Sequence, residues 1–87
     1  MPPPDQYWAI GTAADCEIQV TDPYASAYHC VVHRANDGTC TIRDLGSTNG
    51  TRIRRPGQDD IKVIGWMPLH PGEALIVGRT IIPWRQQ

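Results

Sequence analysis

The sequence predicts an all-β fold, namely a β-sandwich of about eight to nine short, mainly antiparallel strands with loops at one end that form a binding site. Three observations favour this class. Short apolar runs alternate with turn residues, eight glycines and eight prolines interrupt those runs at regular spacing, and no window is long enough for an amphipathic helix. Inward-facing Ile, Val and Leu side chains are expected to form the core.

Each expected strand ends at residues that disfavour further strand pairing. The first run stops at Gly11, the second at Asp22-Pro23 and the third at Asn36-Asp37-Gly38. Pro56-Gly57 and Pro68 separate later runs, and Pro68 is interpreted as a break rather than as part of a strand. The expected strands cover 7–10, 17–20, 30–34, 39–43, 51–54, 61–64, 73–77 and 80–82.

The length of 87 residues is that of one small domain with a modest core, so a deep catalytic cleft is not expected. We expect this domain to cover residues 7–84, after an extended arm at 1–6 with three consecutive prolines and before a tail at 85–87. The first residues show no basic segment followed by an apolar one, and no long apolar run occurs. These features predict a cytoplasmic protein with no membrane partner.

Charge and cysteine content limit the binding partners. The formal net charge of -1 gives no broad positive field, so no nucleic-acid partner is expected and any anion must be recognised locally. All basic residues except Lys62 are Arg, whose planar donor fork suits phosphate or carboxylate. Three cysteines without a C-x-x-C spacing argue against a disulfide framework and against a metal site, and no cofactor is expected.

Two loop segments carry more information than turn chemistry requires. Ser26-Ala27-Tyr28-His29 comes directly before an expected strand, and Asp44-Leu45-Gly46-Ser47-Thr48-Asn49-Gly50-Thr51 directly follows the next one. Together with Ile10-Gly11, Leu69-His70-Pro71-Gly72-Glu73 and Ile76-Val77-Gly78, these motifs resemble the forkhead-associated (FHA) domain over nearly the whole expected domain. The resemblance implies an FHA-like β-sandwich that reads phosphothreonine peptides and is not an enzyme.

The resemblance also implies a role for each candidate residue. Ser26 would bond a phosphate oxygen, Thr48 would add hydroxyl or backbone donors, and Asn49 would pair with the backbone of the bound peptide. His29 would brace the two loops from behind, and Gly50 would set the direction of the Asn49 turn. The implied phosphopeptide-binding residues are Ser26, Thr48, Asn49, Ser47, Thr12 and Arg79, and the implied supporting residues are Gly11, His29 and Gly50.

Three residues count against a full phosphate pocket. The family has Arg at the position of Thr12 and often has Arg or Asn at the position of Ala27, so two contributors are missing. Asp22 adds a negative charge to the loop that carries Ser26, unless its side chain points away. A hydrogen bond to a charged group contributes about 1.5–3 kcal/mol, so these departures predict weakened phosphopeptide binding.

Other arginines are candidates to replace the missing charge. Arg79 follows Gly78 in the last loop and is the first choice. Arg52 and Arg54 alternate with Ile53, so both project to the opposite face of their strand. The alternative is that all three are ordinary solvated side chains on exposed surfaces.

A second departure concerns the start of the fold. The family's first two strands have no counterpart before Tyr7, because consecutive prolines cannot form them. The sandwich is therefore expected to have an open N-terminal edge, through which a homodimer or a strand-swapped oligomer could form. Trp8, Trp66 and Trp84 could contribute to such an interface or could fill the core and its rim.

Two binding functions follow from these observations. The favoured one is a phosphothreonine-peptide-binding interaction module, and the alternative is a phospho-independent interaction or dimerisation module on the same scaffold. A hydrolase that used Ser26, His29 and Asp44 is not favoured, because the S-x-x-H spacing lacks the strained nucleophile turn of such enzymes.

Overall fold

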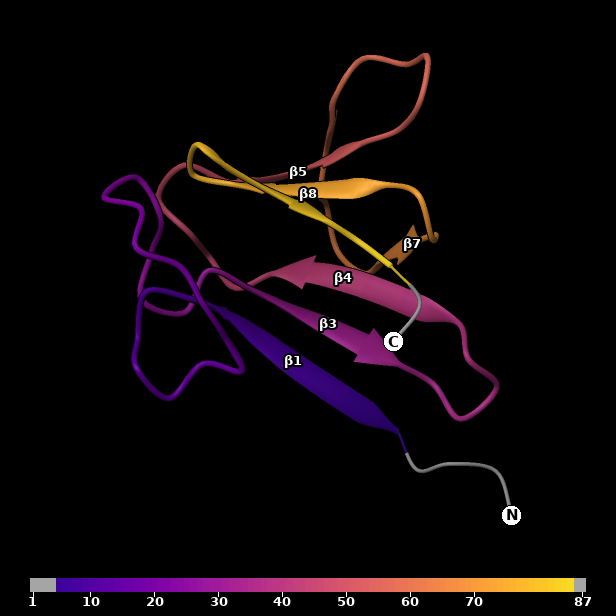
Figure 1. Cartoon of the computed structure of the whole chain (residues 1–87), viewed down its shortest axis with the longest axis horizontal. Helices are drawn as coiled ribbons and strands as arrows, with labels where there is room; N and C mark the ends of the chain where they lie inside the picture. Colours follow the sequence, from indigo (N-terminus) through magenta and orange to yellow (C-terminus); the bar gives the residue numbers. More distant parts are fainter. Residues whose placement is uncertain (1–4, 86–87) are drawn as a thin grey trace.

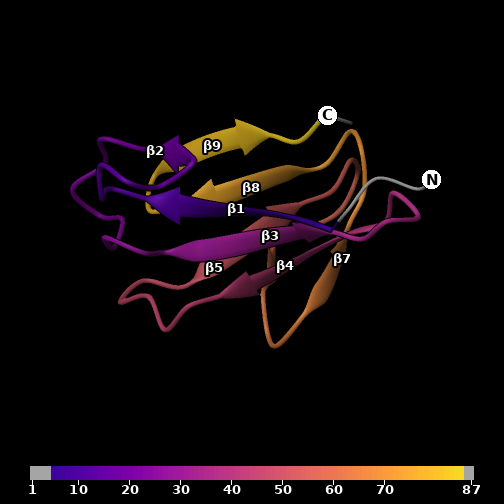
Figure 2. The same ribbon diagram turned by 90° about the horizontal axis from the view of Figure 1, so that it is seen from below.

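Two β-sheets that face each other make up the computed structural model, which describes residues 5–85 (Figure 2). The strands in these residues are β1 (Gln6–Gly11), β2 (Ile18–Gln19), β3 (Cys30–Arg34), β4 (Cys40–Asp44), β5 (Thr51–Arg54), β6 (Ile61–Lys62), β7 (Met67–Leu69), β8 (Ala74–Val77) and β9 (Thr80–Pro83). One sheet has the order β2-β1-β3-β4-β7, and the other has the order β6-β5-β8-β9. All neighbours are antiparallel except β1 and β2, which confirms the predicted all-β sandwich.

Alternation of side chains along the strands produces the core. In β5, for example, Thr51 and Ile53 are buried while Arg52 and Arg54 are exposed. The buried cluster consists of Ile10, Val20, Cys30, Val32, Ile42, Ile53, Val63, Leu69, Leu75, Val77 and Trp84. Trp84 is 3% exposed and meets Trp8 edge to face, with ring centroids 5.7 Å apart. Trp66 is 46% exposed and lies outside this core.

The strand at Met67–Leu69 was not expected, because Pro68 was interpreted as a break. In the structure Pro68 lies opposite Thr41 in β7, the edge strand of the five-stranded sheet. An edge strand tolerates proline, because the missing N–H is needed only on a side that has a neighbour. The expected strand at 61–64 is correspondingly shorter and ends at Lys62.

The ends of the expected domain lie partly outside the described residues. The arm predicted at 1–6 includes residues 1–4, and the tail predicted at 85–87 includes residues 86–87, which the structure does not describe. Gln6 belongs to β1 and pairs with Arg34. Within the described part of the chain, no helix is long and apolar enough to span a lipid bilayer.

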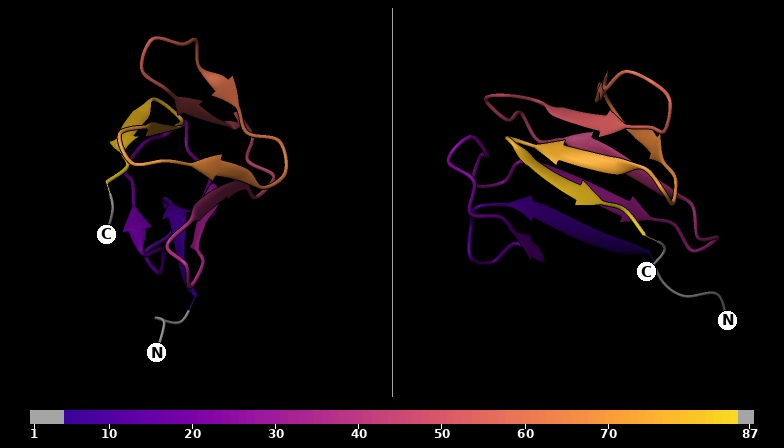
Figure 3. Two further views of the ribbon diagram at one scale, coloured as in Figure 1. Left: turned by 90° about the vertical axis from the view of Figure 1, so that its right-hand side faces the viewer. Right: turned by 45° about the horizontal axis from the view of Figure 1, so that its top comes forward.

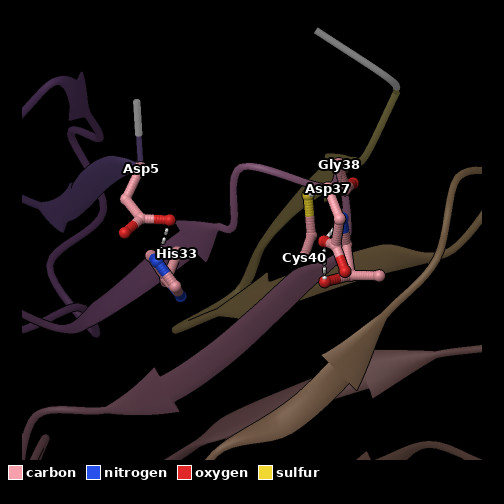
Figure 4. Close-up of polar contacts among 6 residues, drawn as sticks. Asp5, His33, Asp37, Gly38 and Cys40 are labelled. Carbon is pink, nitrogen blue, oxygen red and sulfur yellow. Dashed lines mark hydrogen bonds and ion pairs between the residues drawn. The ribbon is translucent and has the colours of Figure 1, made fainter. Parts of the chain in front are cut away.

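The loops that precede β3 and β5 gather at one end of the sandwich with the turn between β8 and β9 (Figure 1). The turns between β3 and β4 and between β7 and β8 lie at the other end, as do both ends of the described chain (Figure 3). Near that second end, His33 Nε2 lies 3.4 Å from the Asp5 carboxylate, and Asp37 accepts hydrogen bonds from Thr39 (Figure 4). The candidate residues therefore lie apart from the chain ends.

Gly11, at the end of β1, lies where a side chain would not fit. A Cβ atom there would be 2.1 Å from the carbonyl oxygen of Ala27 and 2.9 Å from that of Ser26. This close approach lets the N–H groups of Thr12 and Ala13 donate to the same two carbonyl oxygens, each at 3.1 Å. The absence of a side chain at Gly11 thus allows β1 to support the loop that carries Ser26.

We expect Gly11→Ala to lower the free energy of unfolding by about 3 kcal/mol or more, because the added methyl group must displace backbone atoms. Urea unfolding followed by tryptophan fluorescence measures this change. The control is Gly46→Ala, at a position with a φ of 76° and no neighbouring atom within 4 Å, where left-handed strain alone costs about 1–2 kcal/mol. Equal losses in the two variants would contradict the close-packing explanation.

Candidate functional site

His29 links the two loops that carry the candidate residues. Its ring is completely buried, at 0% exposure. The backbone N–H of Ser26 donates to Nδ1 at 3.1 Å, so Nε2 carries the proton and donates to the carbonyl oxygen of Gly50 at 2.8 Å. One neutral imidazole therefore fixes the loop before β3 against the loop before β5.

Ser26 and Thr48, which lie on the two loops that His29 joins, form a hydrogen bond with each other. The backbone N–H of Thr48 donates to the Ser26 hydroxyl oxygen, 3.2 Å away. Because that oxygen acts as an acceptor, the hydroxyl proton of Ser26 remains available for another acceptor. Thr48 is exposed, so this residue and the Ser26 hydroxyl, from separate loops, lie beside each other at the surface.

The side chain of Asn49 is oriented by a hydrogen bond to the loop before β3. Its side-chain Nδ2 donates to the carbonyl oxygen of Tyr24 at 2.8 Å. This bond leaves the amide oxygen as a free acceptor at an exposed position. Gly50 follows with a φ of 78°, a left-handed conformation that glycine adopts without steric cost, and the chain then turns into β5.

Asp44 organises the loop between β4 and β5 from inside. Its carboxylate accepts hydrogen bonds from the backbone N–H groups of Gly46 and Ser47 and from the hydroxyl groups of Ser47 and Thr51. Burial opposes ionisation of this group, but the hydrogen bonds from Ser47, Thr51 and Gly46 outweigh it and lower the pKa of Asp44. The Ser47 hydroxyl is thus directed into the loop, toward Asp44.

Asp22 points away from Ser26, toward the turn between β8 and β9. Its buried carboxylate accepts hydrogen bonds from the backbone N–H groups of Tyr24 and Arg79 and from the Thr80 hydroxyl. The bond from Tyr24, followed by that from Thr80, lowers the pKa of Asp22 despite its burial. The Asp22 carboxylate is therefore bonded to the turn between β8 and β9, and its negative charge does not face Ser26.

Arg79 is brought to the candidate site by the same turn. Its guanidinium carbon lies 4.0 Å from the centre of the Tyr24 ring, a cation–π distance. Tyr24 in turn accepts the hydrogen bond from Asn49, so Arg79 and Asn49 contact the same residue. Sequence reasoning missed Tyr24, because it contributes a backbone carbonyl and a ring face that no motif indicates.

The side of the site formed by Thr12 carries no arginine or lysine. Residues 12–28 include neither residue type. The backbone groups of Thr12 are occupied by the Ser26 carbonyl oxygen and by the Gln19 side chain, each at 3.1 Å. Nearby, the Tyr28 hydroxyl donates to the Asp15 carboxylate at 2.8 Å. By contrast, Arg79 lies over Tyr24, the residue that Asn49 contacts.

The geometry does not assemble a serine-hydrolase relay. Both ring nitrogens of His29 are engaged by backbone groups of Ser26 and Gly50, and its contact with Ser26 is to the amide rather than the hydroxyl. Asp44 is bonded to Ser47 and Thr51. All three cysteines are free, and no cluster of three or more potential metal ligands occurs in residues 5–85.

Comparison with known proteins identifies the class. A family model of the FHA domain matches residues 8–78, so the chain belongs to the FHA family. Over 76 residues it is 34% identical to the FHA domain-containing protein FhaB of Mycolicibacterium smegmatis, a match that covers 87% of this chain and 45% of FhaB. The chain thus spans just under half the length of that relative.

Solved structures of FHA domains are similar in fold. One comes from a structural and functional analysis of phosphothreonine-dependent FHA domain interactions and has a TM-score of 0.78 and 25% identity, over 93% of this chain and 77% of that chain. The N-terminal FHA domain of S. cerevisiae Rad53p, in complex with a phosphothreonine peptide, has a TM-score of 0.68 and 26% identity, over 84% of this chain and 56% of that chain.

We expect Asp44→Asn to lower the free energy of unfolding by about 2 kcal/mol at pH values near 7, because bonds to a charged acceptor are weakened. The lowered pKa of Asp44 means that its carboxylate contributes stability above the unfolded pKa and loses that contribution as pH falls toward the folded value. The difference between wild type and variant should therefore narrow below about pH 4. Urea unfolding across pH measures it, and a difference independent of pH would contradict this explanation.

Proposed function

We propose that this FHA domain binds phosphothreonine-containing proteins or peptides at the surface formed by Ser26, Thr48 and Asn49. The observation that supports this most strongly is the hydrogen bond from the Thr48 N–H to the Ser26 hydroxyl. It brings the Ser26 hydroxyl and Thr48, from two loops, to one surface position, and a phosphate with three acceptor oxygens requires donors from more than one loop. The solved FHA domain of Rad53p, which carries a phosphothreonine peptide, supports the same assignment.

Each residue has a distinct role in this proposal. The Ser26 hydroxyl donates its free proton to a phosphate oxygen, and the Thr48 hydroxyl adds a second donor. Asn49 accepts a hydrogen bond from a backbone N–H of the bound peptide through its free amide oxygen. Arg79 supplies positive charge from the Tyr24 ring, and Ser47 acts through Asp44 to hold the loop in shape.

Because Thr12 stands where the family has Arg, the proposed site binds phosphate less tightly than a site with that arginine would. Its side chain carries no charge, and the candidate cation Arg79 lies over the Tyr24 ring. The proposed partner is therefore bound with modest affinity, and phosphate recognition depends on hydroxyl and backbone donors more than on charge. The cytoplasmic location expected from the first residues stays a prediction.

We expect a phosphothreonine peptide to bind at least about tenfold more tightly than the same peptide without phosphate, since hydrogen bonds to a charged group contribute about 1.5–3 kcal/mol. Isothermal titration of both forms, selected from a varied peptide library, measures the ratio. Ser26→Ala and Arg79→Gln should each reduce the ratio. Arg43→Gln, on the outer face of the other sheet, is the charge-matched control and should not. Equal affinities for both peptide forms in wild type would overturn the proposed function.

We expect Thr12→Arg to strengthen binding of the phosphorylated peptide by about 1–3 kcal/mol, because it adds one charged donor where the family has Arg. Affinity for the unphosphorylated peptide should not change. The same titration measures both values. An unchanged affinity for the phosphorylated form would argue that no phosphate pocket is formed beside Ser26.

A second candidate function is phospho-independent association through the open side of the sandwich. β9 is an edge strand, and Ile81 at its centre is 49% exposed. β2 pairs with β1 only at Ile10 and Gly11, so among residues 5–85 the first part of β1 has no strand paired on that side. An unpaired edge can add a strand from a second copy of the chain, which would give a homodimer or a strand-swapped oligomer.

For this second candidate we expect a mass that rises with concentration in light scattering, and Ile81→Lys should return it to the mass of one chain, because a charge on the edge blocks strand addition. The proposal concerns the full chain at micromolar concentrations. A mass of one chain at every concentration would remove it.

A further inference from the structure

A row of four side chains crosses the outer face of the four-stranded sheet. The strand registers place Lys62 opposite Arg52, Arg52 opposite Ile76, and Ile76 opposite Ile81. Their neighbours along the two central strands, such as Ile53 and Leu75, point into the core and are buried. Because side chains alternate between the faces of a sheet, these four lie together on the outside, with the two cations at one end of the row.

The two cations of this row form no salt bridge within residues 5–85. Like charges directly opposite each other in a sheet are destabilising, yet Arg52 and Lys62 are exposed neighbours and neither forms a salt bridge in that range. The arginines that follow differ from this pair, since Arg54 is bonded to Asp60 and Arg55 to Glu73.

Asp60 is the acidic residue near this pair, but it does not neutralise the charges of Arg52 and Lys62. Asp60 is close enough to Arg52 for that charge to help lower its pKa, but hydrogen bonds from Arg54 are the main cause. Both carboxylate oxygens of Asp60 accept hydrogen bonds from Arg54, at 3.0 and 3.1 Å. Two positive charges therefore remain side by side on the sheet, with donors available for an anion.

A small hollow connects this pair to the proposed peptide-binding surface. It has a volume of about 160 Å³ and is lined by Asn49, Gly50, Arg52, Ile76 and Gly78. Lys62 is not among the lining residues but lies beside one of them, because its Cε atom would be 4.0 Å from a Cβ atom placed at Gly50. A peptide that contacts Asn49 can therefore follow the hollow to Arg52, whose neighbour on the adjacent strand is Lys62.

We propose that Arg52 and Lys62 bind an anionic side chain of the same partner peptide, a carboxylate or a second phosphate, a few residues away from the phosphothreonine. The inference rests on the proposed function and adds the partner's chemistry to it. The Arg52 fork and the Lys62 ammonium supply the charged donors, and Ile76 supplies an apolar floor beside them. Thr12 contributes no positive charge to the proposed binding surface, whereas Arg52 and Lys62 contribute two positive charges on the Asn49 side of it.

The test is a peptide scan against the full chain. The starting peptide has phosphothreonine with alanine at the surrounding positions. In a series of variants, one glutamate replaces alanine at each of about four positions on either side in turn. Phosphoserine is then placed at the position where glutamate strengthens binding most. Fluorescence anisotropy at low salt should find a position where glutamate strengthens binding about three- to tenfold, as expected for one or two exposed ion pairs. Phosphoserine there should strengthen it at least as much, and salt should reduce the gain.

Charge removal then assigns the gain to the two residues. The double variant Arg52→Gln with Lys62→Gln should lose the preference for glutamate and keep the affinity for the alanine peptide. Arg43→Gln, on the outer face of the other sheet, should keep both. Thermal unfolding of the double variant should match or exceed that of wild type, because a pair of opposed like charges is removed.

The outcomes separate this inference from the function on which it rests. If the alanine phosphopeptide binds but glutamate helps at no position, or the double variant keeps the preference, the role of Arg52 and Lys62 is refuted while phosphothreonine binding stands. If phosphorylated and unphosphorylated peptides bind equally, or neither binds, the proposed function is refuted and this inference with it.

Discussion

The buried imidazole of His29 is the contact on which the arrangement of the site depends. It accepts from the backbone of one loop and donates to the backbone of another, and the residues it joins are 24 positions apart in sequence, from Ser26 to Gly50. The hydrogen bonds from Thr48 to Ser26 and from Asn49 to Tyr24 join the same two loops, so they require the loops to be held as close together as His29 holds them. Because the ring is fully enclosed, loss of either bond would leave a buried polar atom without a partner.

The two acidic residues of the site region act as internal anchors rather than as ligands. Asp44 holds the loop before β5, and Asp22 holds the loop before β3 against the turn between β8 and β9. Gly78 permits the close approach of Asp22, and Gly11 permits that of β1 to Ala27, since Cβ atoms at these glycines would collide with those residues. The carboxylates of Asp44 and Asp22 are therefore bonded within the protein, and the surface at Ser26, Thr48 and Asn49 presents hydroxyl and amide groups.

Much of the fold could be predicted from the sequence, because buried strands reveal themselves by alternation, as in Thr51-Arg52-Ile53-Arg54. β7 could not, because a proline excludes a strand only where the sheet continues, and Pro68 lies at an edge. The motif residues indicated Ser26, Thr48 and Asn49. The direction of Asp22 and the position of Arg79 over Tyr24 could not be predicted, since they depend on contacts more than 50 residues apart, such as the 57-residue separation of Asp22 and Arg79.

The most direct test of this account is the hydrogen-bonding state of His29, measured by long-range proton–nitrogen NMR on the full chain. We expect a neutral ring with the proton on Nε2, an unprotonated Nδ1, and a slowly exchanging Nε2 proton bonded to the Gly50 carbonyl. A ring protonated on Nδ1, or one whose Nε2 proton exchanges freely with water, would contradict the claim that His29 joins the two loops.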